Sequence, residues 1–407
     1  MKVTPRGHTQ PKQMIAVIAD DLTGAAELGA IGLRFGLRAE VITAMQAASN
    51  TPSFSSEAEL ISIDTDSRAC VPEEAQRRVA MVAKALSHSR AIYKKVDSVL
   101  RGHVVIEIES VLHQLGWRRA LLLPANPSLG RVIRDGKYFI RGKPIHETEF
   151  RLDPQYPRRD SSVLNLLGSS HSIPIRLCRV HETLPPEGII VGETETVEDL
   201  RQWASRCEQS ILAGGGAEFF NAWLETSLGI AISGPVAQAR LADNQPELFI
   251  SGTASESSRA FIAESRYHGV PIFSLHEAMA CGADFSLTKG ERLAARVVEA
   301  LQSNLRVILE IGLPAEIDRS VAQKLPMRLA QVADAILSRV KLGHIFAEGG
   351  ATAAALVHRL GWSHLKVLQE LAPGVVTLRP SAYEQCRLTV KPGSYAWPKE
   401  LIASGAR

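Results

Sequence analysis

Short apolar runs alternate with helical patterns along the first half of the chain. The run Met14–Ala19 is apolar and β-branched, ends before two aspartates, and precedes a helical pattern that opens near Thr23. A second run, Glu59–Asp64, is followed by Pro72 and two glutamates, residues that are favoured where a helix begins. Buried strands that alternate with helices predict a mostly parallel sheet with helices packed on it.

The same alternation continues toward residue 200. Strands are expected at Ala91–Tyr93, Ala120–Leu123 and Gly188–Val191, with helices after Gly102 and from about Val197. Two stretches interrupt the pattern. Pro124–Arg159 is rich in glycine, proline and charge, and we expect a long irregular loop of the kind that is functional or mobile. Gly214–Gly216 is interpreted as the start of a linker-like region that reaches Pro246.

The alternation restarts in the second half of the chain. Strands are expected at 247–251, 306–309, 344–347 and 387–390, with helices after Ser255, over about 316–341 and up to Gly361. We therefore expect an α/β protein with two α/β domains, each a mostly parallel sheet flanked by helices. The predicted domains are residues 14–240 and 247–407, and the polar residues 1–13 form a frayed leader.

Composition narrows the class of protein. The chain is 45% hydrophobic, and its 46 Lys+Arg balance 43 Asp+Glu. There is no basic excess for nucleic acid or a membrane surface, so any phosphate site must be local. The apolar run from Met14 breaks at Asp20, too soon for a signal peptide or a membrane span. Five separated cysteines without a C-x-x-C pair favour a reduced, cytoplasmic compartment.

Three turns that follow predicted strands of the first half carry charged side chains. They are Asp20–Gly24, Asp64–Arg68 and Lys94–Gly102. A lone aspartate there is usually a helix cap, and a lone arginine usually forms a surface ion pair. Ligands of open α/β sheets bind at the carboxyl ends of strands, so the clustering of all three turns favours a binding site.

Three turns in the second half combine glycine with hydroxyl groups. Ser251–Ser255, Glu348–Thr352 and Lys391–Ser394 each follow a strand. Such turns suit phosphate groups through unpaired backbone N–H groups, although each alone is a weak signal. The run Gly24–Gly29 has the glycine spacing of a P-loop, but Ala30 and Ile31 stand where that motif needs Lys and Ser or Thr.

Several enzyme classes lack their motifs. The sequence has no H-E-x-x-H, G-x-S-x-G, H-R-D or D-F-G set. No G-x-G-x-x-G follows a strand, which argues against a dehydrogenase of two α/β domains.

Seven segments in order resemble the four-carbon acid sugar kinase family. The segments are IADDLTGA (18–25), DTDSR (64–68), KKVDSVLRG (94–102), LPANPSLGRVIRDGKYFIRGKPIHETEFRLDP (123–154), SGTAS (251–255), EGGAT (348–352) and VKPGS (390–394). The family consists of a sugar-binding N-terminal domain and a nucleotide-binding C-terminal domain. The resemblance implies ATP-dependent phosphorylation of threonate, erythronate or an oxo-tetronate at the terminal hydroxyl, in a cleft between the domains.

The resemblance also implies the site residues. The acid-sugar site would contain Asp20, Asp21, Arg68, Lys95, Asp97, Ser98 and Arg101. The ATP site would contain Ser251, Thr253, Ser255, Gly349, Gly350, Ala351, Thr352 and Gly393. Chemically, Arg68 or Arg101 suits the substrate carboxylate, and either Asp20 or Asp97 suits the role of base. ATP and Mg²⁺ are the expected cofactors, the metal ligands stay unassigned, and a homodimer is an open expectation.

Three positions depart from the family pattern. Ala351 replaces an acid, Val99 a threonine and Glu27 an aspartate. Either Glu348 substitutes for the acid missing at position 351, or ATP binding is weakened. The alternative function is therefore a non-catalytic or weakly catalytic protein that binds a sugar acid or a nucleotide.

Overall fold

The computed structural model describes most of the chain. The described residues are 14–43, 55, 57–153, 155–168, 172–233, 245–275, 287–312, 319–393 and 395–403. The predicted leader, the end of the first predicted domain at residue 240, Cys281 and Ser394 lie outside them. Within these ranges no helix combines the length and apolar character needed to cross a membrane.

Strands and helices alternate along most of the sequence. The strands are β1 (Ile15–Ala19), β2 (Ala39–Thr43), β3 (Leu60–Asp64), β4 (Ala91–Lys95), β5 (Arg119–Leu123), β6 (Arg131–Arg134), β7 (Lys137–Ile140), β8 (Lys143–Pro144), β9 (Ile175–Cys178), β10 (Gly188–Gly192), β11 (Ile211–Gly215), β12 (Glu247–Ser251), β13 (Ile272–Ser274), β14 (Arg306–Glu310), β15 (His344–Glu348), β16 (His364–Ala372), β17 (Val375–Pro380) and β18 (Arg387–Lys391). The α-helices are α1 (Leu22–Arg34), α2 (Pro72–Ala85), α3 (Val104–Leu115), α4 (Val163–Leu167), α5 (Val197–Ser205), α6 (Ala217–Ala222), α7 (Glu256–Tyr267), α9 (Leu287–Ser303), α10 (Arg319–Ala322), α11 (Leu325–Leu337), α12 (Gly350–Arg359) and α13 (Lys399–Ala403).

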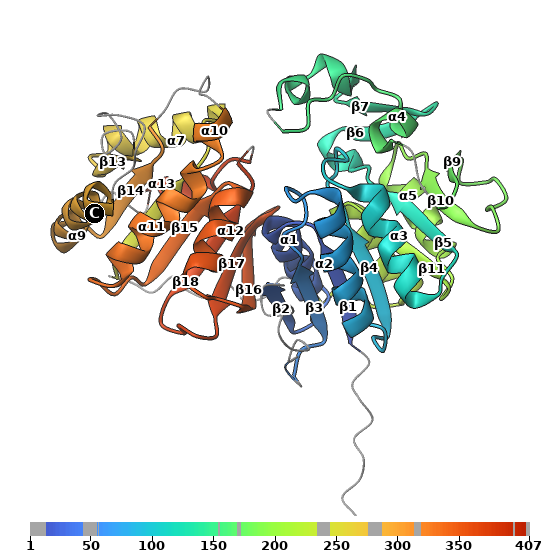
Figure 1. The fold of residues 1–407 in the computed structure, drawn as a ribbon, viewed down its shortest axis with the longest axis horizontal. Helices are drawn as coiled ribbons and strands as arrows, with labels where there is room; N and C mark the ends of the chain where they lie inside the picture. Colours follow the sequence, from blue (N-terminus) through green and yellow to red (C-terminus); the bar gives the residue numbers. More distant parts are fainter. Residues whose placement is uncertain are drawn as a thin grey trace, which may run out of the picture.

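A single 15-stranded sheet runs through the molecule (Figure 1). Its order is β13-β14-β12-β15-β18-β17-β16-β2-β3-β1-β4-β11-β5-β10-β9. Within this sheet the strands of each half pair in parallel, apart from β16 and β17, so the α/β expectation is confirmed. The two expected sheets are joined, however, because β16 pairs antiparallel with β2 at His364–Ile42 through Lys366–Glu40.

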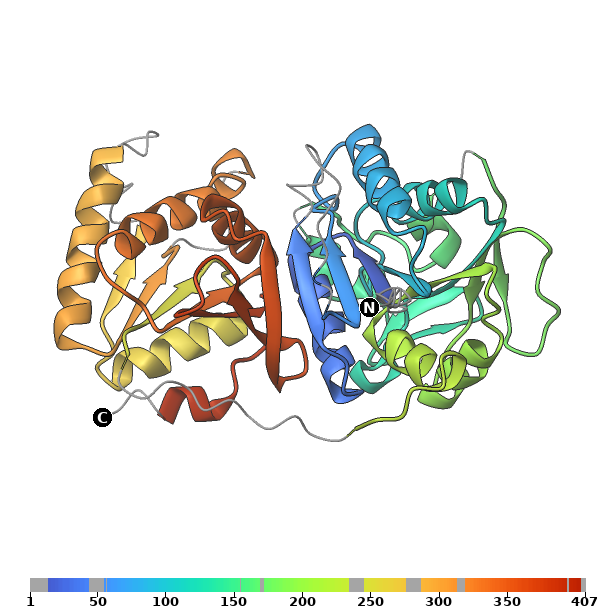
Figure 2. The same cartoon turned by 90° about the horizontal axis from the view of Figure 1, so that it is seen from below.

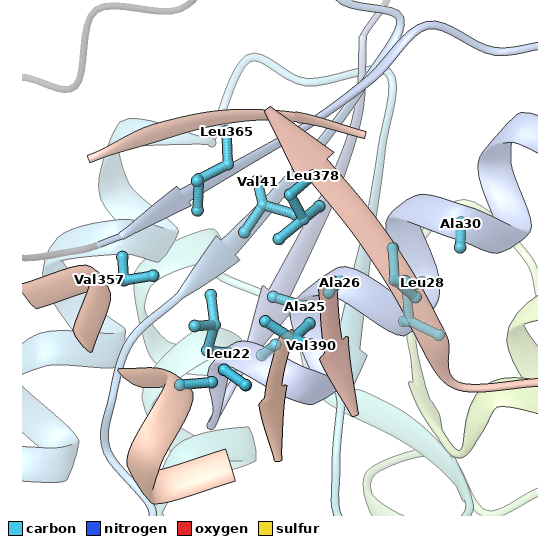
Figure 3. Close-up of a cluster of buried hydrophobic side chains, with 14 of the residues drawn as sticks. Leu22, Ala25, Ala26, Leu28, Ala30, Val41, Val357, Leu365, Leu378 and Val390 are labelled. Atoms are coloured by element: carbon cyan, nitrogen blue, oxygen red, sulfur yellow. The ribbon is translucent and has the colours of Figure 1, made fainter. Parts of the chain in front are cut away.

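Helix α1 covers this junction (Figure 3). Leu22, Leu28 and the alanines of this helix are buried against side chains of β2, β16, β17 and β18, and also of α12. The same apolar core continues under α5, α6, α9, α11 and α12, so it belongs to both halves of the chain. Each fully buried leucine in such a core contributes about 2 kcal/mol relative to exposure. The halves are therefore held together by one core as well as by a strand pairing.

Separate cores fill the opposite face of the sheet. The first, in the N-terminal half, includes side chains of α2 and α3, and the other includes side chains of α7 and α13. Figure 2 shows these helices, with α2 and α3 in blue and cyan and α7 and α13 in yellow and red. The aromatic rings of Phe249, Phe346 and Trp397 pack together in the second of these cores. Helices on both faces are what buried parallel strands require.

Two sequence interpretations were wrong. Gly214–Gly216 does not begin a linker, because Gly214 and Gly215 end β11, which lies between β4 and β5. A Cβ atom at Gly215 would lie 2.1 Å from the carbonyl oxygen of Leu123, so the glycine reflects close strand approach. The stretch 124–159 is not an irregular loop throughout, because β6, β7 and β8 form a small antiparallel sheet within it. We call residues 124–160 the insert.

Strand order places a switch point in each half. The connections after β1 and β4 leave in opposite directions, as do those after β12 and β15. Open α/β sheets bind ligands outside the carboxyl ends of strands at such points. The charged turns follow β1 and β4, and the glycine-rich turns follow β12 and β15.

Replacing Gly29 of α1 by valine tests the packing at the junction. A Cβ atom at Gly29 would lie 2.8 Å from Cγ2 of Val367 in β16, so the larger side chain overpacks the interface. We expect a loss of about 2 kcal/mol in the free energy of unfolding, measured by urea denaturation. The double variant Gly29→Val/Val367→Ala should recover most of the loss, and an unaffected Gly29→Val variant would contradict this packing.

Candidate active site

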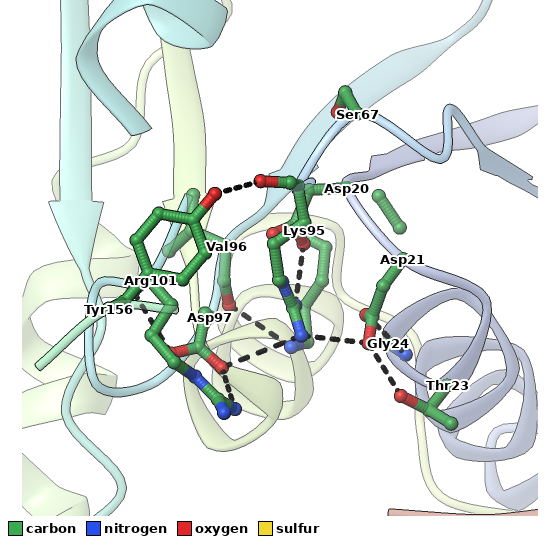
Figure 4. Close-up of polar contacts among 12 residues, drawn as sticks. Asp20, Asp21, Thr23, Gly24, Ser67, Lys95, Val96, Asp97, Arg101 and Tyr156 are labelled. Atoms are coloured by element: carbon green, nitrogen blue, oxygen red, sulfur yellow. Dashed lines mark hydrogen bonds and ion pairs between the residues drawn. The ribbon is translucent and has the colours of Figure 1, made fainter. Parts of the chain in front are cut away.

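A bidentate ion pair between an arginine and a carboxylate, which we call a fork, joins the turn after β3 to the turn after β1 (Figure 4). Arg68 donates from Nε and Nη2 to the two carboxylate oxygens of Asp20, at 2.7 and 3.0 Å. Its Nη1 donates to Oδ2 of Asp21 at 2.9 Å. Asp21 also caps α1, because its Oδ1 accepts from the Gly24 backbone N–H and its Oδ2 accepts from the Thr23 hydroxyl. Every donor nitrogen of the Arg68 guanidinium is thus bound to a carboxylate.

The turn after β4 forms a second fork beside the first. Arg101 donates from Nε and Nη2 to the two oxygens of Asp97, at 3.0 and 2.8 Å. Asp97 also accepts the backbone N–H groups of Val99 and Arg101. Leu100 is buried at a φ of 63°, in the left-handed region that leucine rarely adopts. Such backbone strain concentrates at functional sites.

Buried ionic contacts support both turns from below. Lys94 of β4, fully buried, pairs with Glu107 of α3 at 2.8 Å. Glu107 also accepts the Ser67 hydroxyl at 2.6 Å, which ties the Arg68 turn to the same helix. Lys95 points to the other face, where Nζ lies 3.6 Å from Glu27 of α1. Of the two lysines predicted together in this turn, Lys94 is therefore structural.

The insert contributes site residues that the sequence analysis did not select. Arg131 Nη1 donates to the Ser98 hydroxyl at 2.5 Å. Asp153 accepts Arg101 Nη1 at 3.2 Å. The hydroxyl of Tyr156, a residue labelled in Figure 4, donates to the backbone carbonyl of Arg68. The sequence signals were the length and charge of the loop and the family resemblance of residues 123–154, and neither assigned a role to a particular residue.

The three glycine-rich turns of the second half converge. A Cβ atom at Gly252 would lie 1.7 Å from the Thr352 hydroxyl oxygen, and one at Gly393 would lie 2.9 Å from that of Thr253. The Gly252 N–H also donates to the Glu348 carbonyl at 3.1 Å. Glycine is required at these positions because the turns leave no room for a side chain. Gly349 (φ 97°) precedes α12, and the half-buried Gly350 and the exposed Ala351 begin that helix.

Some predicted nucleotide-site residues have internal partners instead. The buried Ser251 hydroxyl donates to Glu348 Oε2 at 2.8 Å, and Glu348 Oε1 accepts Lys391 Nζ at 2.6 Å. Glu348 is 1% exposed, so its carboxylate cannot substitute for the acid missing at Ala351. The Ser255 hydroxyl caps α7 by accepting the Ser258 N–H.

The two sets of turns meet at the start of α12. A Cβ atom at Gly350 would lie 3.3 Å from the Thr23 hydroxyl oxygen and 3.4 Å from Asp21 Oδ2. The N-terminus of a helix attracts anions through its free N–H groups and its dipole. An anion at that end of α12 would therefore lie beside the carboxylates and guanidinium groups of the first half.

Charge pairing keeps the central groups ionised. Burial raises the pKa of Asp97, but Arg101 and Arg68 outweigh it and hold the pKa well below its usual range. Burial opposes the charge of Arg68 too, yet Asp20 and Asp21 raise its pKa well above the ordinary value. Asp97 is therefore a poor proton acceptor at neutral pH.

Two family models match the chain: a sugar-binding N-terminal domain over residues 15–222 and a nucleotide-binding C-terminal domain over residues 248–395. A D-threonate kinase from Salmonella typhimurium is 26% identical over 390 residues, covering 88% of this chain and 89% of that protein. A D-erythronate kinase from Heliobacterium modesticaldum is 25% identical over 402 residues, covering 88% of each chain.

A more distant relative and two solved structures also match nearly the whole chain. A 3-oxo-tetronate kinase from Methylobacterium radiotolerans is 22% identical over 420 residues, covering 94% of this chain and 96% of that protein. A solved structure from Salmonella typhimurium LT2 superposes with a TM-score of 0.76 at 17% identity, covering 97% of this chain and 99% of the other. One from Haemophilus influenzae has a TM-score of 0.68 at 19% identity, covering 96% and 100%. These two structures support the fold.

Removing Glu107 tests the support beneath the charged turns. The variant Glu107→Ala leaves Lys94 buried without a counter-ion, so we expect a loss of about 3–5 kcal/mol in the free energy of unfolding. Urea denaturation measures it. The double variant Lys94→Met/Glu107→Leu removes both charges and should recover more than half of the loss. Equal losses in the single and double variants would show that the ion pair is not the cause.

Proposed function

Because the chain belongs to the four-carbon acid sugar kinase family, we propose that it transfers the γ-phosphoryl group of ATP to the terminal hydroxyl of a four-carbon sugar acid. D-Threonate, D-erythronate and 3-oxo-tetronate, the acids named for its relatives, are the first candidates. Kinase and transferase activity follow from family membership, whereas the choice among the acids is the proposal.

The contact between α12 and the turn after β1 is the observation that carries the proposal. Gly350 opens α12 so close to this turn that a Cβ atom there would lie 3.3 Å from the Thr23 hydroxyl oxygen and 3.4 Å from Asp21 Oδ2. A phosphate held by the N–H groups of α12 would face the carboxylates that are suited to bind sugar hydroxyls. Phosphoryl transfer depends mainly on such in-line positioning and on neutralising charge.

We assign the role of proton acceptor to Asp20 rather than Asp97. Asp97 accepts two backbone N–H groups in addition to the Arg101 fork, and its pKa lies well below the usual range because Arg101 and Arg68 outweigh its burial. Among the described residues, the carboxylate of Asp20 accepts hydrogen bonds only from Arg68. A carboxylate that accepts fewer hydrogen bonds can more readily give up one of them and accept a hydrogen bond from a substrate hydroxyl instead.

ATP would be bound through the three glycine-rich turns, and Mg²⁺ through its phosphates. Among the described residues there is no group of three His, Cys, Asp or Glu side chains that could hold a metal. Mg²⁺ in nucleotide sites usually needs only one or two carboxylates besides phosphates and water. We propose Asp21 for this role, because its Oδ2 lies near the start of α12 at Gly350. The metal would neutralise charge on the transferring phosphoryl group.

The expected cytoplasmic location and homodimer stay predictions. Light scattering during size-exclusion chromatography would measure the mass of the assembly in solution.

A panel assay tests the proposed function. Purified protein with MgATP and each of the three acids at millimolar concentration should release ADP with at least one acid, with a phosphorylated product found by mass spectrometry. Asp20→Asn should lower kcat by about 100-fold, because the proton acceptor is lost.

The panel also distinguishes the alternative function. Stabilisation of the wild-type chain by an acid, without any phosphorylated product, would indicate a binding protein. Turnover that Asp20→Asn leaves unchanged would contradict the assigned role of Asp20 but not the kinase activity.

Placing an acid at position 351, where the family pattern has one and this chain has alanine, tests whether Ala351 weakens ATP binding. Ala351 is exposed in the first turn of α12, where a carboxylate could bind a water molecule of the MgATP complex. We expect Ala351→Asp to lower the KM for MgATP by about tenfold, or about 1.4 kcal/mol. Ala351→Asn, matched in shape but uncharged, should not lower it. A raised KM for Ala351→Asp would contradict the prediction.

A further inference from the structure

Arg158, at the end of the insert, is buried with one edge of its guanidinium unpaired. The residue is 7% exposed, and neither its Nε nor its Nη2 has a hydrogen-bond partner among the described residues. Arginine is rarely buried unless it is paired, because the charge loses its hydration. A guanidinium left in this state is stabilised when an anion binds.

The unpaired edge has the geometry of the two forks already described. Arg68 uses Nε and Nη2 to bind both oxygens of Asp20, and Arg101 uses the same two nitrogens on Asp97. In Arg158 those same two nitrogens have no partner in the described part of the chain. Two parallel N–H groups on one edge match the two oxygens of a carboxylate.

Arg158 belongs electrostatically to the candidate active site. Burial lowers its pKa, and the charges that act on it are those of Asp97, Arg101, Asp153 and Tyr156. Asp153 and Tyr156 are themselves bonded to Arg101 and Arg68. The insert thus brings a third guanidinium to a site where the other two are saturated.

We propose that the Arg158 guanidinium binds the carboxylate of the substrate acid, an inference that rests on the proposed function. The sequence suggested Arg68 or Arg101 for this role. In the structure, however, Arg68 already binds the carboxylate of Asp20, and Arg101 binds those of Asp97 and Asp153. Lys95 Nζ donates to the Val96 carbonyl and faces Glu27. In contrast to these three cations, Arg158 has two buried guanidinium nitrogens, Nε and Nη2, without a hydrogen-bond partner among the described residues.

This role predicts how the enzyme distinguishes an acid from a neutral polyol. A polyol of the same length would leave the buried guanidinium unpaired, whereas an acid satisfies it. A site with a dedicated buried partner discriminates strongly against ligands that lack the matching group. The insert would therefore set the preference for acids.

The variant Arg158→Met tests the assignment, because methionine fills the volume without the fork. For the best acid of the panel, kcat/KM should fall at least about 100-fold, mainly through KM, while kcat/KM for threitol or erythritol stays within about threefold of the wild type. Arg158→Lys should recover part of the loss. Arg159→Met, an exposed neighbour, is the control and should have no effect.

The Tm measured without ligand distinguishes a binding role from a purely structural one, because loss of a structural arginine would lower the Tm. Because Arg158→Met removes an unpaired buried charge, its Tm should equal or exceed that of the wild type, while the Tm increase caused by the acid is lost. A fall in kcat/KM that is equal for acid and polyol would assign Arg158 to the phosphates of ATP and overturn the proposal. An unchanged KM for the acid would overturn it as well.

The proposed function and the role of Arg158 fail in different ways. A wild-type chain that binds D-threonate or D-erythronate without phosphorylating it contradicts the kinase proposal, yet loss of that binding in Arg158→Met still supports the carboxylate contact. A wild-type chain that neither binds nor phosphorylates any acid overturns both.

Discussion

The packing of helix α1 against both halves of the sheet is the constraint on which the candidate site depends. The helix begins at Leu22, is capped by Asp21, and buries apolar side chains against strands of both halves. Its first turn therefore has a fixed position relative to α12, whose opening Gly350 approaches Thr23 and Asp21. A core that is close-packed tolerates little relative movement, so the charged turns and the glycine-rich turns are held face to face.

Charge pairing gives the acid-sugar side its rigidity. Two arginines each form a fork on an aspartate of the charged turns, and a buried lysine–glutamate pair lies beneath them. Bidentate contacts fix orientation as well as distance. The same pairing leaves Arg68 and Arg101 little capacity for a ligand, which is why the unpaired edge of Arg158 stands out among the described residues.

Much of the fold was readable from the sequence because buried parallel strands have a distinctive pattern. The runs that lead to Asp20, Asp64, Glu348 and Lys391 are all strands, and the turns after them were found by their glycine and charge. The sequence did not predict β11, because its glycines resemble those of a linker. The structure gives another reason for these glycines: the backbones of Lys94 and Leu123, in the neighbouring strands, lie too close to leave room for side chains. The pairing of β16 with β2 involves residues more than 300 positions apart, and no local pattern indicates it.

The sequence by itself determined the α/β class, the family and the turns that carry chemistry, because strand ends and their glycine and charged residues are local features. Only the tertiary structure decided which of those side chains are available to a ligand. Glu348 and Lys94 stand in the predicted turns that carry chemistry, but both are buried in ion pairs. Arg158, by contrast, is one of several arginines in a long loop, and two of its buried guanidinium nitrogens have no hydrogen-bond partner in the described ranges. Whether a charge is already paired depends on partners brought together by folding, and their separation along the chain gives no sign of it.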